Sequence, residues 1–198
     1  MNEIARTIAA LALAIFAVAC SPAAAPPGKA PLAGAKIGGP FTLIDQNGRT
    51  ISERSFAGKY RIVYFGYTFC PDVCPIDAQN IGQGLRLVEK ADPALGARIV
   101  PLFITVDPAR DTPAVLKSFV SAFHPHMIGL TGSDAAIAAT AKEFAISYQK
   151  ADPGPGGGYM VQHTSVGYLM DPQGKPLALL PVEQNPQAVA DEIRRWAR

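Results

Sequence analysis

Two cysteines, Cys70 and Cys74, stand four positions apart where a β-branched and aromatic run passes into a helical pattern. Thiols at positions i and i+4 of a helix share one face, so their sulfur atoms can approach each other if Cys70 lies at the helix entry. The positive end of a helix favours the thiolate, which is both the nucleophile and the metal-binding form of cysteine. The spacing therefore predicts a pair that forms a disulfide or holds a soft metal ion.

A metal ion needs more ligands than these two thiols supply. Zn(II) requires a complete tetrahedral set, whereas soft Cu(I) accepts fewer ligands. Among the three histidines of the chain, His163 follows a glycine-rich stretch at the start of an expected strand, and it is the best candidate for a third ligand. His124 and His126 flank Pro125 just after a helix and could indicate an auxiliary metal site. Histidines are common and favourable near a helix C-terminus, however, and we interpret these two as structural.

Each of these residues also has an ordinary interpretation. Cys70 and Cys74 could form a structural disulfide, although a domain of this size has little need of one that closes so short a loop. By itself, His163 could be a partly buried histidine without a special role. Asp72, between the cysteines, either tunes the thiolates or is a solvated turn residue, and both interpretations stay open. Three methionines in apolar runs are interpreted as core residues and not as ligands: Met127, Met160 and Met170.

The surrounding sequence predicts elements that could position these side chains. An Asn47-Gly48 turn between short apolar runs predicts a β-hairpin over residues 41–51. The spacing of apolar residues predicts where the strands and helices around the cysteines begin and end. The expected strands are residues 61–67, 99–106 and 128–130, and the expected helices are residues 75–90, 111–123 and 133–144. Asp111 is the expected N-cap of the second helix, with Pro113 in its first turn.

The end of the chain predicts two hairpins that close the sheet, within residues 146–180, and a final helix from about Pro186. Strand, helix, strand, helix, hairpin and final helix is the order of a thioredoxin-like α/β fold, here with an extra N-terminal β-hairpin. Thioredoxins place two residues between their cysteines and this chain has three, so its redox properties should differ. We expect one such domain over residues 39–198.

The N-terminal residues predict export. Residues 1–19 contain an apolar run that is too short to span a bilayer but suits a signal peptide. Cys20 ends a sequence that resembles a bacterial lipobox, so lipidation of Cys20 is expected, with ordinary cleavage after Ala19 as the alternative. Residues 20–38 are rich in Ala, Pro and Gly and predict a flexible tether. The expected location is the bacterial periplasm, at the membrane surface.

The charge composition argues against nucleic-acid binding. The chain has 18 basic and 16 acidic residues, for a formal net charge of +2. These charges are scattered, so no basic block offers itself to phosphates.

Three separated motifs resemble the Sco (SenC) family of copper-binding, thioredoxin-like proteins: residues 64–75, residues 106–113 and residues 163–165. The resemblance implies that Cys70, Cys74 and His163 bind copper as Cu(I) or Cu(II). It also implies a role in assembling the binuclear copper A centre in subunit II of cytochrome c oxidase. Phe69 departs from the family pattern, since many relatives carry a more polar residue there. The expected lipid anchor is a second departure, because many relatives have a transmembrane helix.

The sequence thus predicts a copper chaperone for the copper A centre. The alternative is a thiol-disulfide oxidoreductase that keeps the oxidase cysteines reduced, with Cys70 and Cys74 as its redox-active pair. A peroxidase or redox sensor is a third possibility, but no residue pattern indicates a peroxide site. The expected partners are oxidase subunit II, other periplasmic copper chaperones or thiol reductants, and the membrane through the lipid.

Overall fold

The computed structural model describes residues 28–151 and 158–198. The predicted signal peptide and the predicted lipidation site at Cys20 lie outside these residues. A seven-stranded mixed sheet forms the centre of the fold, in the order β2-β1-β5-β4-β3-β8-β9. Its strands are β1 (Thr42–Asp45), β2 (Thr50–Ser52), β3 (Tyr60–Gly66), β4 (Ile99–Thr105), β5 (Ile128–Thr131), β8 (Gly167–Met170) and β9 (Pro176–Leu180).

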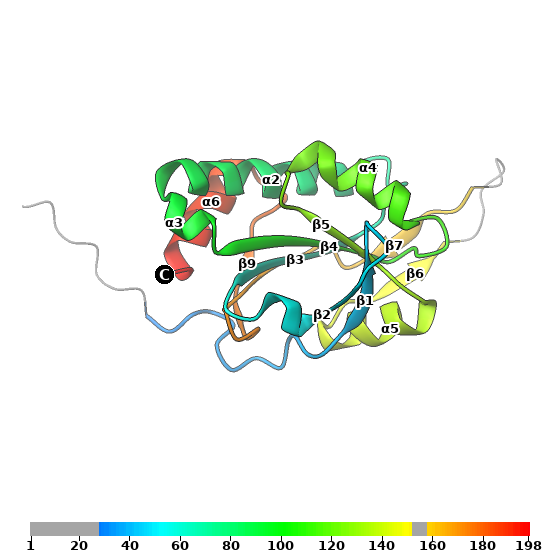
Figure 1. Cartoon of the computed structure of the whole chain (residues 1–198), viewed down its shortest axis with the longest axis horizontal. Helices are drawn as coiled ribbons and strands as arrows, with labels where there is room; N and C mark the ends of the chain where they lie inside the picture. The colour runs from blue at the N-terminus through cyan, green and yellow to red at the C-terminus, as the bar shows by residue number, and fades with distance from the viewer. Residues whose placement is uncertain (1–27, 152–157) are drawn as a thin grey trace, which may run out of the picture.

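Helices cover both faces of this sheet (Figure 1). They are η1 (Glu53–Phe56), α2 (Val73–Ala91), α3 (Pro93–Gly96), α4 (Pro113–Phe123), α5 (Asp134–Glu143) and α6 (Pro186–Trp196). One apolar core lies between the sheet and the layer of α2, α4 and α6, and a second core lies on the face that α5 covers. Central strand β3 is buried along its whole length, which is the reason for its unbroken apolar and aromatic composition.

The topology confirms the predicted thioredoxin-like fold. Strands β3 and β4 run parallel, and α2 connects them in sequence. Strand β8 then pairs antiparallel with β3, and β9 pairs with β8 before α6 ends the fold. The predicted N-terminal hairpin is also present, since β1 pairs with β2 across a turn in which Gly48 has a φ of 78°. Because β1 also pairs with β5, this hairpin extends the main sheet.

One part of the predicted ending is wrong. We expected two hairpins to close the sheet, but only β8 and β9 join it. Strands β6 (Tyr148–Lys150) and β7 (Val161–His163) pair with each other in a separate two-stranded sheet. Residues 164–166 have no strand structure, so the chain changes direction between β7 and β8. Strand β7 therefore ends outside the main sheet, with His163 as its last residue.

The segment before β1 is bound to the domain. Residues 28–38 were predicted to belong to a flexible tether, yet Leu32 and Ile37 pack against the core. The Leu32 N–H donates to the Leu177 carbonyl at 2.9 Å, and the Gly38 N–H donates to the Glu143 carbonyl at 2.7 Å. The folded part thus begins before the predicted boundary at Gly39, because burying two apolar side chains favours contact over free solvation. Within the segments that the structure describes, no helix is long and apolar enough to cross a membrane.

Candidate metal centre

The two cysteines lie where β3 passes into α2. Helix α2 begins at Val73, so Cys74 is in its first turn and Cys70 is in the loop before it. The i and i+4 relation was predicted on the condition that Cys70 lies at the helix entry, and it does not apply, because Cys70 precedes the helix. The chain bends at residues 71–72, between Cys70 and the helix. Both thiols are free, with exposed fractions of 8% for Cys70 and 0% for Cys74. Cys70 thus lies at the rim of the site and Cys74 lies beneath it.

His163 reaches the same place from the end of β7. Its Nε2 lies 3.4 Å from the Sγ of Cys74. Its Nδ1 lies 3.1 Å from the carbonyl oxygen of Thr164, so a neutral ring donates Nδ1–H there and keeps a lone pair on Nε2. Burial lowers the pKa of His163, which favours the neutral imidazole. The His163 ring is therefore neutral, with its proton on Nδ1 and its Nε2 lone pair directed at the site, as a metal ligand requires.

The two thiols have opposite acidities. Burial opposes ionisation of Cys70, but hydrogen bonds from the backbone N–H groups of Cys74 and Asp72 outweigh it and lower the pKa of Cys70. Burial raises the pKa of Cys74 to about 12. Cys70 is therefore the thiol that ionises first.

Beneath the thiols, a buried hydrogen-bond network connects the elements of the site. The Asp77 Oδ2 accepts hydrogen bonds from the Tyr64 hydroxyl at 2.8 Å and the Ser165 hydroxyl at 2.9 Å. These residues come from α2, β3 and the segment after His163. Desolvation raises the pKa of Tyr64 far above its ordinary value, so its hydroxyl stays protonated and continues to donate. Sequence reasoning missed Asp77, although its position three residues after Cys74 placed both on one helical face.

Asp111 supports the cysteine loop and does not cap α4. The N-cap of α4 is Thr112, whose hydroxyl accepts a hydrogen bond from the Val115 N–H. The buried Asp111 carboxylate instead accepts from the Thr68 N–H at 3.0 Å and from the Thr68 hydroxyl at 2.6 Å. It also accepts from the Thr105 hydroxyl at 2.6 Å. The predicted cap was wrong because these inward donors satisfy the carboxylate better than a helix end would.

The rim of the site is apolar. Four large apolar side chains around it are about half exposed: Phe69, Val73, Ile76 and Met160. The guanidinium of Arg110 lies 5.0 Å from the centre of the Phe69 ring, and the Tyr67 hydroxyl points at the Met160 sulfur at 3.8 Å. Met127 and Met170 are core residues, as predicted, but the same prediction was wrong for Met160, which is 46% exposed. Asp72 is exposed at the N-cap position of α2 and makes no side-chain capping bond.

His124 and His126 lie elsewhere. They follow α4 and approach Glu89, near the C-terminal end of α2, whereas the cysteines lie at its N-terminal end. By the rise of an α-helix, Glu89 is about 22 Å from Cys74 along the helix axis. These two histidines therefore do not belong to the thiol site.

Comparisons with known proteins find relatives that match most of the chain. Residues 29–198 match the family described as SCO1/SenC. The chain is 42% identical to protein SenC of Rhodobacter capsulatus over 161 residues, which cover 81% of this chain and 71% of that protein. The structure of Bradyrhizobium japonicum ScoI with copper bound matches with a TM-score of 0.72 and 39% identity, over 81% of this chain and 99% of that chain.

A second solved structure matches at lower identity. It is BsSco, described as a member of the Sco family of cytochrome c oxidase assembly proteins with a disulfide switch. The TM-score is 0.61 at 26% identity, over 80% of this chain and 92% of that chain.

Proposed function

This chain belongs to the SCO1/SenC family, and we propose that it is a copper chaperone that binds copper through Cys70, Cys74 and His163. Its cargo goes to the copper A centre in subunit II of cytochrome c oxidase. One observation carries the proposal: the His163 Nε2 lies 3.4 Å from the Cys74 sulfur, although the two residues are 89 positions apart. A copper-bound relative and a relative named for oxidase assembly support it.

The donor set fits copper. Two thiolates are soft ligands that select Cu(I) over hard cations, and an imidazole nitrogen suits copper in either oxidation state. The His163 Nε2 has a free lone pair because Nδ1 is bound to the Thr164 carbonyl. The position of Cys70 at the rim leaves one ligand within reach of an approaching acceptor site.

The same ligands couple copper loading to redox state. A Cys70–Cys74 disulfide offers no thiolate, so Cu(I) binding requires its prior reduction. That reduction takes two electrons and two protons from an external dithiol, which becomes a disulfide. Oxidation of the pair therefore switches loading off.

The test is an anaerobic Cu(I) titration of the reduced protein against a competing chelator. We expect one tightly bound copper in the wild type and a loss or strong weakening in Cys70→Ser, Cys74→Ser and His163→Ala. Gln162→Ala is the matched control, because Gln162 is the exposed neighbour of His163 on β7. Unchanged affinity in His163→Ala would contradict the three-ligand site.

The second candidate function is that of a thiol-disulfide oxidoreductase which keeps the oxidase cysteines reduced. The arrangement of Cys70 at the rim above a fully buried Cys74 favours it, since an attacking and a resolving thiol are placed in this way. His163→Ala separates the two candidates, because it removes a copper ligand and leaves the dithiol intact. Oxidase assembly that persists in this variant would support the reductase, and assembly that fails while dithiol exchange persists would support the chaperone.

We also propose that the protein is exported and held at the periplasmic membrane surface by lipid on Cys20. The lipobox-like sequence and the Ala, Pro and Gly-rich residues after it support this proposal. The intact mass of the membrane-extracted protein tests it: a mass that begins at Cys20 and includes acyl chains is expected. A mass that begins at Cys20 without acyl chains would indicate ordinary secretion instead.

A further inference from the structure

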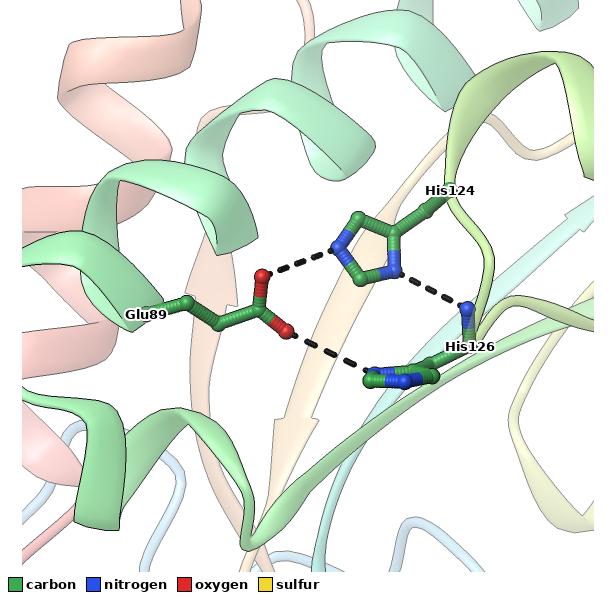
Figure 2. A group of neighbouring side chains, drawn as sticks. All are labelled: Glu89, His124 and His126. Carbon is green, nitrogen blue, oxygen red and sulfur yellow. Dashed lines mark hydrogen bonds and ion pairs between the residues drawn. The ribbon is translucent and has the colours of Figure 1, made fainter.

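Glu89, His124 and His126 form a second group of side chains that could hold a metal ion (Figure 2). Glu89 lies near the end of α2, His124 directly follows α4, and His126 precedes β5. One ligand atom from each residue lies within 4.8 Å of the other two. No spacing or motif in the sequence connects Glu89 with the two histidines, which were interpreted as structural.

The carboxylate of Glu89 faces both rings. Its Oε2 lies 3.3 Å from the Nε2 of His124, and its Oε1 lies 3.5 Å from the Nδ1 of His126. The ring centroids are 5.4 Å apart and the ring planes are tilted by 66°. The His124 side chain is 1% exposed and that of His126 is 66% exposed. One side of the group is therefore fixed in the interior, and the other is open to an ion from solvent.

A hydrogen bond sets the state of His124 before any ion binds. The backbone N–H of His126 donates to the Nδ1 of His124 at 3.2 Å. The neutral His124 ring therefore carries its proton on Nε2 and donates it to the Glu89 carboxylate. An ion on Nε2 would move that proton to Nδ1 and break the bond from His126. His126 lies in an exposed turn, in which the Met127 N–H donates to the His124 carbonyl. In this turn the backbone N–H of His126, once released from His124, can bind water instead. The loss of one hydrogen bond is offset by bonds to the metal.

We propose that Glu89, His124 and His126 form a binding site for a borderline divalent transition-metal ion, Zn(II) or Cu(II), separate from the thiol site. Two imidazoles and one carboxylate make up the protein ligands of known zinc sites that leave a fourth position to water. The same ligands suit Cu(II), which the order of divalent affinities places above Zn(II). No thiolate takes part, so the site has no preference for Cu(I) and is independent of the redox state of the cysteines.

The ion would connect α2 to the turn between α4 and β5. An ion that binds the folded state and not the unfolded chain stabilises the fold by mass action. At a free Zn(II) concentration of about a hundred times Kd, we expect the melting temperature to rise by about 5–10 °C.

The test uses the full-length protein with Cys70→Ser and Cys74→Ser, and with any free Cys20 thiol blocked by alkylation. Zn(II) alone is titrated against a chromophoric chelator. We expect one bound Zn(II) and an affinity that falls at least about tenfold in His126→Ala and in Glu89→Gln. These two positions are partly or mainly exposed, so the variants should keep the fold, and their metal-free melting temperatures check this.

Two controls separate this site from the rest of the protein. His163→Ala in the same background removes the remaining histidine of the thiol site and should leave Zn(II) affinity unchanged, while Glu183→Gln removes a charge from an exposed loop. Absence of competitive binding in the background protein would overturn the proposal. Binding that is lost in His163→Ala and kept in His126→Ala would also overturn it, and neither result bears on copper binding by the intact cysteine pair.

A spectroscopic measurement adds a second criterion. With Cu(II) as the probe, electron paramagnetic resonance should show coupling to two imidazole nitrogens, and His126→Ala should remove one of them. An unchanged nitrogen pattern in His126→Ala would contradict the assignment of His126 as a ligand.

Discussion

Cys70 and Cys74 differ in the chemistry that their environments allow. Cys70 is at the rim, and backbone N–H groups stabilise its thiolate. Cys74 is fully buried, and its pKa is raised to about 12. The thiolate is the reactive form, so Cys70 is suited to make first contact with a metal donor or a disulfide. Cys74 is suited to complete the site once its proton has left.

We therefore predict a large difference in alkylation rate between the two cysteines. At pH 7.5, iodoacetamide should modify Cys70 at least about a hundredfold faster than Cys74, because each pKa unit changes the thiolate fraction about tenfold. Time-resolved peptide mapping measures both rates and separates them from Cys20. Cys74 in a Cys70→Ser variant should remain slow, and equal rates for the two thiols would contradict the burial and hydrogen bonding described above.

At the scale of single elements, the β1–β2 turn contains a buried charge. The Asp45 Oδ1 accepts from the backbone N–H groups of Asn47 and Arg49, at 2.8 and 2.9 Å. Its Oδ2 accepts from the Arg49 Nε at 2.8 Å. Burial opposes ionisation of Asp45, but these hydrogen bonds outweigh it and hold its pKa below the ordinary value of 3.8. The turn is thus stabilised by an ionised carboxylate.

This pKa shift predicts a pH-dependent stability. A carboxyl group with a lowered pKa in the folded state contributes stability above its unfolded pKa, and this contribution is lost as the pH falls through the folded pKa. Asp45→Asn should lower the free energy of unfolding by about 1–3 kcal/mol at pH 7. The deficit should shrink as the pH falls below about 4, where the wild-type carboxyl becomes protonated. Urea unfolding at several pH values measures it.

The exposed Glu183 provides the control for this experiment. Glu183→Gln should change the free energy of unfolding little at any pH, because its side chain lies in an exposed loop. A deficit of Asp45→Asn that is constant down to pH 2.5 would show that the ionised carboxylate does not stabilise the turn.

At the scale of the whole molecule, close helix packing determines where the second candidate site lies. Gly82 of α2 meets the end of α4, and a Cβ at this position would lie 2.6 Å from the Phe123 carbonyl oxygen. The contact is with backbone, which cannot rotate away as a side chain could. The absence of a side chain at Gly82 therefore allows α2 to approach α4, and this approach brings Glu89 within reach of His124.

Gly82→Ala should destabilise the protein although alanine is the better helix former. The gain in helix propensity is about 1 kcal/mol, whereas overpacking against fixed backbone costs about 1–3 kcal/mol or more. Because the contact at 2.6 Å is with backbone, the cost lies in the upper part of this range, and we expect a net loss of about 1–2 kcal/mol in urea unfolding. Zn(II) binding at the second site should also weaken. Gln83→Ala, at the exposed neighbouring position, should be neutral or slightly stabilising. Equal stability of Gly82→Ala and wild type would contradict the close contact.

The sequence by itself determined the features that depend on local physics. The Asn47-Gly48 turn, the strand at β3 and the Ser133 cap of α5 follow from backbone preference, residue period and short-range hydrogen bonds, and the structure confirms them. The paired cysteines were recognisable for the same reason, since their spacing is local. His163 was the best candidate for a third ligand because it follows a glycine-rich stretch at the start of an expected strand, and the likeness to a known family strengthened that choice.

Only the tertiary structure decided which distant side chains meet. Asp77 beneath the thiols, Asp111 on the cysteine loop and Glu89 beside His124 all take their roles from partners on other elements. Their residue types also suit a helix surface, a helix cap or a solvated face, so the sequence could not choose between these uses. The choice depends on how helices and strands pack, because a buried polar group must be hydrogen-bonded and packing determines which partners lie within reach.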